Sequence, residues 1–154
     1  MRNYFFALIL ALLLSGCGFI RSSDSNIAPP IAHKVVNTAY SQIGKKYLSG
    51  GTSPATGFDC SGLVWWAYKR NGLQVPRKAV EQAYAGAAIS PHNARPGDIV
   101  VFRTSHSPNG LHTGLHAGGS MFIHSPRKGS AVRTESMEIP YWGNKLVMVR
   151  RVLQ

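Results

Sequence analysis

The chain has 154 residues, of which 44% are hydrophobic and only 15% are charged. This balance excludes an intrinsically disordered chain and suits one compact domain. The formal net charge is +11, which predicts attraction to polyanions such as acidic cell-wall polymers or anionic lipid headgroups. Because the basic residues are scattered and form no basic helix or aromatic–basic motif, the composition disfavours a nucleic-acid partner.

Residues 1–16 predict a signal peptide rather than a part of the fold. An apolar run over residues 4–14 follows the positive charge of Arg2. The run is too short to span a bilayer, which needs about 20 residues, but it has the length typical of a signal-peptide core.

The apolar run ends in Leu14-Ser15-Gly16-Cys17, which resembles a bacterial lipobox. The resemblance implies cleavage before Cys17 and acylation of its sulfur by chains such as palmitate; the alternative is an ordinary signal peptide with an incidental cysteine. Gly18 stands where an aspartate often retains lipoproteins at the inner membrane, so we expect an anchor in the outer membrane that faces the periplasm. The polar residues of segment 17–30 predict a flexible tether.

Helical patterns dominate the first half of the remaining chain. Apolar residues recur every three or four positions over residues 31–43 and 60–70, and each stretch predicts a helix. Between them, residues 47–58 are rich in glycine and predict a loop. Residues 80–87 predict a short third helix. Cys60 is therefore expected at a helix N-terminus.

Strand patterns dominate the second half. Four runs separated by Gly, Pro, Asn and Ser predict strands at residues 98–103, 113–117, 121–124 and 146–153. Helices followed by strands favour an α+β domain with an antiparallel sheet, here over residues 31–154. We expect helix 60–70 to pack against that sheet.

Cys60 is the leading candidate for chemistry. Only two cysteines are present, and lipidation of Cys17 leaves Cys60 unpaired in an oxidising compartment, which favours a reactive thiol over a buried structural cysteine. The free N–H groups at the start of a helix favour negative charge, so we expect a lowered thiol pKa. The backbone N–H of Cys60 is a candidate oxyanion donor.

The six histidines are the candidates for a base. His112 and His116 are an even number of residues apart and therefore face one side of a strand, and His124 lies on the next strand. A base that a polar neighbour orients is what a cysteine nucleophile needs. A zinc site is the alternative, but HExxH and CxxC motifs are absent, so we expect no metal or cofactor. The six are His33, His92, His106, His112, His116 and His124.

Four motifs in chain order resemble the NlpC-type family of cell-wall peptidases, and the match extends over residues 31–153. The motifs are Asp59-Cys60-Ser61-Gly62-Leu63, Arg95-Pro96-Gly97-Asp98-Ile99-Val100, His112-Thr113-Gly114-Leu115 and Ile123-His124-Ser125. The resemblance implies a papain-like fold with Cys60 as the nucleophile, His112 as the general base and His124 as the polar residue that orients its ring. It also implies that the Tyr47 hydroxyl helps to hold the oxyanion.

The same resemblance implies that Asp59 and Ser61 touch the substrate and that Arg77 lies near the cleft, although a surface arginine is an equal alternative. The chain departs from the family pattern at Ser49 and His116, where the family often has aromatic residues. The polar segment 105–110 is an insertion that either reshapes the cleft or covers it as a lid.

The implied activity is hydrolysis of the bond between the γ-carboxyl of D-glutamate and a diamino acid in peptidoglycan stem peptides, through a thioester on Cys60. Two alternatives are a transpeptidase or acyltransferase that uses the same thioester, and a non-catalytic lipoprotein that binds wall polymers. The expected partners are stem peptides and the membrane that holds the lipid on Cys17. We expect a monomer.

Overall fold

The computed structural model describes residues 27–154, so the predicted signal peptide, Cys17 and most of the predicted tether lie outside the described residues. The packed domain begins within the last residues of that tether. Ala28 is buried in the main core, and the Ile27 carbonyl accepts a hydrogen bond from Arg95 at 2.9 Å. No helix in this part of the chain is long and apolar enough to cross a membrane.

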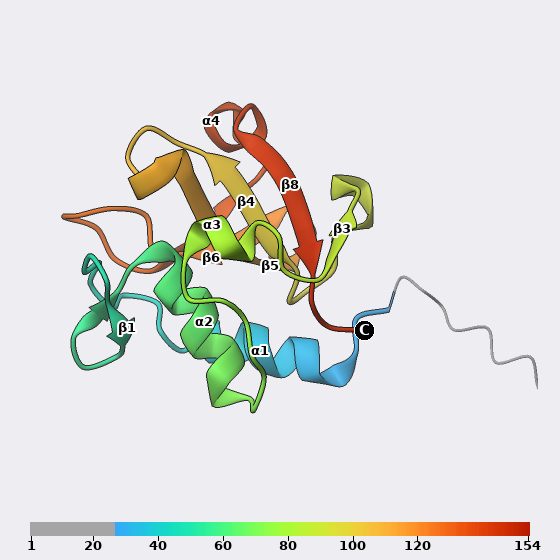
Figure 1. The fold of residues 1–154 in the computed structure, drawn as a ribbon, viewed down its shortest axis with the longest axis horizontal. Coiled ribbons are helices and arrows are strands. Elements are labelled where there is room, and N and C mark those ends of the chain that lie inside the picture. The colour runs from blue at the N-terminus through green and yellow to red at the C-terminus, as the bar shows by residue number, and fades with distance from the viewer. Residues whose placement is uncertain (1–26) are drawn as a thin grey trace, which may run out of the picture.

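Two helices lie together against the sheet (Figure 1). The first, α1 (Pro30–Tyr40), buries alanine and valine side chains spaced three or four residues apart. It ends three residues before the predicted boundary, and the following turn closes at Gly44, whose φ of 87° suits glycine. The second, α2 (Cys60–Arg70), has the predicted bounds. A short hairpin lies in the predicted loop between the helices. Its strands, β1 (Thr52–Ser53) and β2 (Gly57–Phe58), have two residues each.

Six antiparallel strands form the sheet in the order β3-β8-β4-β5-β6-β7. Their bounds are β3 (Ala87–Ile89), β4 (Ile99–Arg103), β5 (Leu111–Gly118), β6 (Met121–His124), β7 (Arg133–Ser136) and β8 (Leu146–Arg151). The connections contain the one-turn helices α3 (Ala79–Gln82) and α4 (Pro140–Gly143) and the 3₁₀ turns η1 (Pro91–Asn93) and η2 (Pro108–Gly110). The predicted α+β fold with an antiparallel sheet is confirmed.

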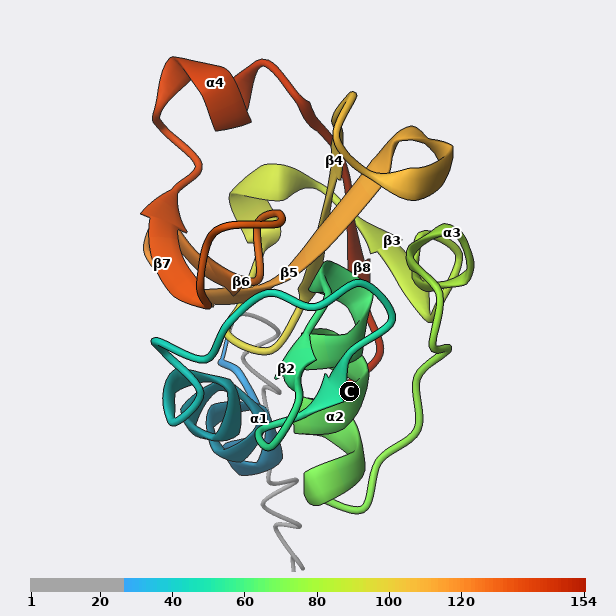
Figure 2. The ribbon, with the colours of Figure 1, turned by 90° about the vertical axis from the view of Figure 1, so that its left-hand side faces the viewer.

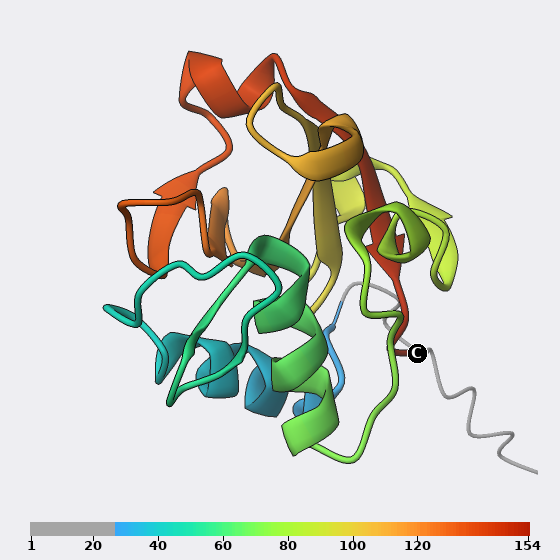
Figure 3. The ribbon, with the colours of Figure 1, turned by 60° about the vertical axis from the view of Figure 1, so that its left-hand side comes forward.

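The sheet buries both faces, and β4 shows how. Alternate side chains of a strand point to opposite faces. Ile99 and Val101 therefore join the core beneath α1 and α2, whereas Val100 and Phe102 pack around Trp142 of α4 on the other face. Figure 3 shows α1 and α2 on one side of the strands and α4 at the opposite end of the molecule.

The predicted helix 80–87 is wrong beyond its first turn. The chain leaves α3 at Gln82 and forms β3, an edge strand paired with β8. Gly86 has a φ of 58°, and a Cβ there would lie 2.0 Å from the Arg151 carbonyl oxygen. The Arg150 guanidinium binds the carbonyls of Tyr84, Ala85 and Gly86, so tertiary contacts replace the helical hydrogen bonds.

Candidate active site

The start of α2 positions Cys60. Asp59 caps the helix, because its Oδ1 accepts the Gly62 N–H at 2.6 Å. Only glycine fits at position 62, since a Cβ there would lie 2.0 Å from the Gly51 carbonyl oxygen. The glycine-rich loop therefore packs directly on the first turn of α2 and fixes the backbone that carries the sulfur.

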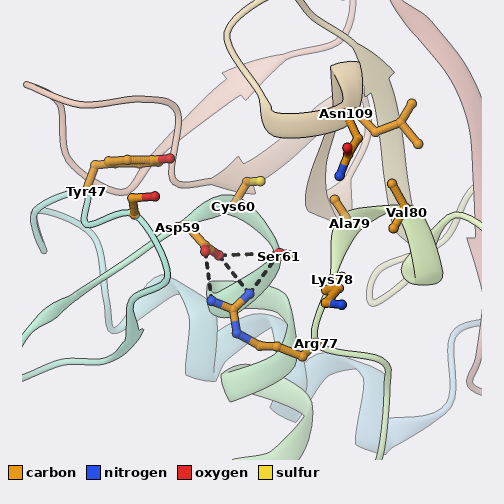
Figure 4. Close-up of a pocket in the computed structure, with 11 residues that line it drawn as sticks. Tyr47, Asp59, Cys60, Ser61, Arg77, Lys78, Ala79, Val80 and Asn109 are labelled. Carbon is orange, nitrogen blue, oxygen red and sulfur yellow. Dashed lines mark hydrogen bonds and ion pairs between the residues drawn. The ribbon is translucent and has the colours of Figure 1, made fainter.

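Cys60 opens into a cavity of about 390 Å³, which we call the Cys60 pocket. Figure 4 shows the Cys60 sulfur at its centre and the Tyr47 hydroxyl directed toward Cys60 from the neighbouring loop. Burial and the nearby Cys60 raise the pKa of Tyr47, so its hydroxyl stays protonated and able to donate a hydrogen bond. The Tyr47 N–H donates to the Ser130 carbonyl at 2.9 Å, which holds this loop beside the β6–β7 connection (Figure 2).

Three linked polar side chains form the floor of the Cys60 pocket. Arg77 donates to Asp59 Oδ1 at 3.0 Å and to Oδ2 at 2.7 Å, and it donates to the Ser61 hydroxyl at 2.9 Å. Asp59 also accepts the Gly50 N–H at 2.9 Å. Because the Asp59 carboxylate already accepts hydrogen bonds from the helix start, the loop and Arg77, its evident role is to position Ser61 and Arg77.

The Cys60 thiol is not ionised by its surroundings alone. Burial raises its pKa, and this effect outweighs the hydrogen bonds from the backbones of Thr113, Ser61 and Cys60 itself, which lower it. The expectation of a lowered thiol pKa is therefore wrong for the free protein. The backbone N–H groups at the helix N-terminus do lower the thiol pKa as expected, but burial of the thiol raises it by more.

The β5 strand brings His112 to Cys60. The Thr113 backbone, which interacts with the Cys60 sulfur, belongs to the residue directly after His112. Within residues 27–154 no hydrogen bond joins the Cys60 thiol to the His112 ring. Such bonds are often long in free enzymes and tighten only when substrate binds.

His112 and His124 form a buried hydrogen-bonded pair across β5 and β6. His112 Nε2 and His124 Nδ1 are 2.8 Å apart, and the two rings meet edge-on at 87°. Trp142 lies against both rings: it stacks on His112 with the ring centroids 5.5 Å apart and meets His124 edge-on at 5.0 Å. Burial lowers the pKa of His112 to about 3, and burial also lowers the pKa of His124. Both rings are therefore neutral near pH 7.

Glu135 of β7 extends this pair. The His124 Nε2 atom is buried without a hydrogen bond in the described chain, and it faces Glu135 Oε1 at 3.8 Å. Glu135 is itself held by Arg133 and by the Trp142 indole N–H. A carboxylate opposite His124 Nε2 favours the proton on that nitrogen, so His124 Nδ1 accepts and His112 Nε2 donates. His112 Nδ1 then carries the lone pair that a general base needs.

Sequence reasoning did not single out Glu135 or Trp142. The one available signal was that Glu135 is among only six acidic residues in a strongly basic chain.

His116 is not joined to the pair, although it shares a face of β5 with His112. It binds the β5–β6 turn, through Nε2 to the Gly119 carbonyl at 3.0 Å and through Nδ1 to the Gly118 N–H at 3.3 Å.

The inserted segment 105–110 contributes to the site. Asn109, the one non-glycine residue with positive φ in the described chain, lines the Cys60 pocket. The insertion therefore shapes the cleft in this structure.

Among residues 27–154, no three His, Cys, Asp or Glu side chains are grouped to hold a metal ion.

Comparisons with known proteins agree with this arrangement. A family model described as the NlpC/P60 family matches residues 44–151. The murein DD-endopeptidase MepH of Escherichia coli K12 is 41% identical over 121 residues, which are 77% of this chain and 45% of that protein. The gamma-DL-glutamyl hydrolase of Bacillus subtilis 168 is 36% identical over 118 residues, 76% of this chain and 28% of that protein.

A solved NlpC/P60 family protein from Bacillus cereus ATCC 10987 superposes with a TM-score of 0.74 at 30% identity. The match covers 84% of this chain and 43% of that one. The chain thus matches less than half the length of each of these three proteins.

Proposed function

Because the chain belongs to the NlpC/P60 family, we propose that it is a peptidoglycan hydrolase, a cysteine endopeptidase that cuts stem peptides through a thioester on Cys60. One observation carries this proposal. A thiol at the start of α2 lies beside the strand of His112, whose ring is hydrogen-bonded to His124 at 2.8 Å. A nucleophile, a base and a residue that orients the base are the parts that acyl transfer requires.

The reaction begins from a neutral thiol and a neutral imidazole. As the Cys60 sulfur attacks the carbonyl carbon, its proton passes to His112 Nδ1, and the Cys60 N–H and Tyr47 hydroxyl stabilise the oxyanion. Collapse of the tetrahedral intermediate breaks the C–N bond, and the amine leaves with the proton from His112. Water then attacks the thioester and gives its proton to His112, and the released thiolate takes that proton back.

The bond we propose joins the γ-carboxyl of D-glutamate to the diamino acid. The relative named gamma-DL-glutamyl hydrolase supports this choice. The relative named murein DD-endopeptidase supports a second candidate, a peptide bond of murein between two D-configured centres.

Replacement of Cys60 by alanine tests the mechanism. Without a nucleophile we expect the release of soluble peptides from purified peptidoglycan to fall by at least about 10³-fold, with an unchanged thermal unfolding midpoint. Mass spectrometry of the wild-type products identifies the bond that is cut. Undiminished cleavage by a folded Cys60→Ala variant would refute the thioester mechanism.

We also propose that residues 1–16 are removed as a signal peptide and that Cys17 is acylated, which anchors the enzyme in the outer membrane facing the periplasm. Several acyl chains on one cysteine give stable anchoring. The full chain should incorporate a labelled fatty acid and sediment with the outer membrane, whereas Cys17→Ser should do neither. An unlabelled wild-type protein would contradict the anchor without touching the enzymatic proposal.

A further inference from the structure

A second cavity, of about 330 Å³, lies beside His112, and we call it the His112 pocket. Its lining includes Thr104, His106, His112, Arg127, Arg133 and Tyr141. Cys60 does not line it, and His112 does not line the Cys60 pocket. The nucleophile and its base therefore open onto different cavities.

Acyl transfer assigns a different part of the substrate to each cavity. The acyl group becomes bonded to the Cys60 sulfur, so it belongs in the Cys60 pocket. The leaving amine takes its proton from His112 and so departs on the side of His112. If the reaction is the one proposed above, the residue that carries this amine lies in the His112 pocket.

We propose that the His112 pocket binds the diamino acid on the leaving side of the cut bond, and that Arg127 recognises a free carboxylate of that diamino acid. This inference rests on the proposed function and narrows its substrate to diamino acids with a free carboxylate.

The charges of the His112 pocket single out Arg127. Arg133 is committed to Glu135, with which it forms an ion pair. The Arg127 guanidinium has no hydrogen bond or ion pair within residues 27–154. Arginine binds carboxylates through two parallel N–H groups, which makes this free side chain the natural partner for one.

The backbone of Arg127 is fixed although its side chain is free. The Arg127 N–H donates to the Ser130 hydroxyl at 3.1 Å, and the Arg127 carbonyl accepts the Ser130 N–H at 3.1 Å. This turn holds Arg127 at the edge of the pocket. The situation is the reverse of that in the Cys60 pocket, where Asp59 already occupies Arg77.

Two peptides that differ in one group test the inference. Both contain D-glutamate joined through its γ-carboxyl to a diaminodicarboxylic acid, whose side-chain carboxylate is free in one peptide and amidated in the other. We expect wild-type kcat/KM to be about 10-fold higher for the free acid, as a charge-assisted hydrogen bond allows. In Arg127→Gln we expect this preference to fall to about 2-fold or less, because the variant loses more activity toward the free acid than toward the amidated peptide.

Lys128→Gln is the matched control, because Lys128 is the neighbouring cation and does not line the pocket. It should keep the preference. Equal cleavage of both peptides by wild-type protein, or equal losses in the two variants, would overturn the carboxylate assignment and leave the hydrolase standing. Cleavage of neither peptide, together with no release of peptides from peptidoglycan, would overturn the proposed function itself.

Discussion

His112 shows how neighbouring residues can prepare a single ring for the proton transfer that we propose. Trp142 fixes its plane, and His124 occupies its Nε2 at 2.8 Å. Glu135 lies beyond His124 and favours the arrangement of protons that leaves His112 Nδ1 free. Since burial keeps both rings neutral, His112 could act as the base we propose without first losing a proton.

Glu135→Gln tests whether Glu135 positions the base. The carboxylate raises the pKa of His112 and of His124, so its loss should lower both pKa values and move the acidic limb of the kcat profile to lower pH. Because Glu135 acts through His124, we expect kcat to fall about 10-fold with little change in KM.

Glu138→Gln is the control, since Glu138 is an exposed acid in the connection between β7 and α4. The control should keep the wild-type profile, and Glu135→Asp should restore part of kcat. A Glu135→Gln variant whose only defect is a lower unfolding midpoint would assign Glu135 a purely structural role.

The elements that the sequence predicted well are those whose apolar side chains repeat with a clear period. The bounds of α2 follow from its buried stripe, and the central strands β4 and β5 lie close to their predicted ranges. Cys60 was therefore correctly expected at a helix N-terminus. The link between His112 and His124 followed from their places on adjacent strands.

Long-range contacts decided the elements that the sequence did not predict. The β7 strand has the polar sequence Arg-Thr-Glu-Ser, and its pairing with β6 becomes visible only in three dimensions. The β3 strand replaces a predicted helical stretch because Arg150 and β8 satisfy its backbone. The thiol pKa was predicted in the wrong direction because the sequence shows a helix start but not the burial around Cys60.

The molecule as a whole combines a strongly basic surface with a buried cluster of neutral histidines. Its net charge of +11 attracts polyanions. Inside, burial lowers the pKa of His112, His116 and His124, and it does so despite nearby carboxylates. Protonation of these rings therefore costs the folded state free energy relative to the unfolded state.

Acid should therefore destabilise the domain. In the unfolded chain His112 binds a proton near pH 6.5, whereas in the folded chain it does so only near pH 3. Between these values the unfolded state holds more protons, so its free energy falls relative to that of the folded state as the pH decreases. From pH 7 to pH 5 we expect the free energy of unfolding to drop by about 2 kcal/mol through His112 alone.

Urea unfolding at the two pH values measures this loss. His112→Gln, which has no titrating ring at this position, should show a smaller drop than the wild type. Equal stability of the wild-type protein at pH 5 and pH 7 would contradict the assignment of a buried neutral histidine.

The segment between β4 and β5 borders both the Cys60 pocket and the His112 pocket. Thr104 and His106 border the His112 pocket, and Asn109 borders the Cys60 pocket. If a substrate occupies both cavities as we propose, a change in the length or composition of this one connection alters the fit of its two halves at once, while the sulfur and both imidazoles keep their places. The connection thus offers a place where the proposed specificity can change, since it belongs to none of the elements that carry Cys60, His112 and His124.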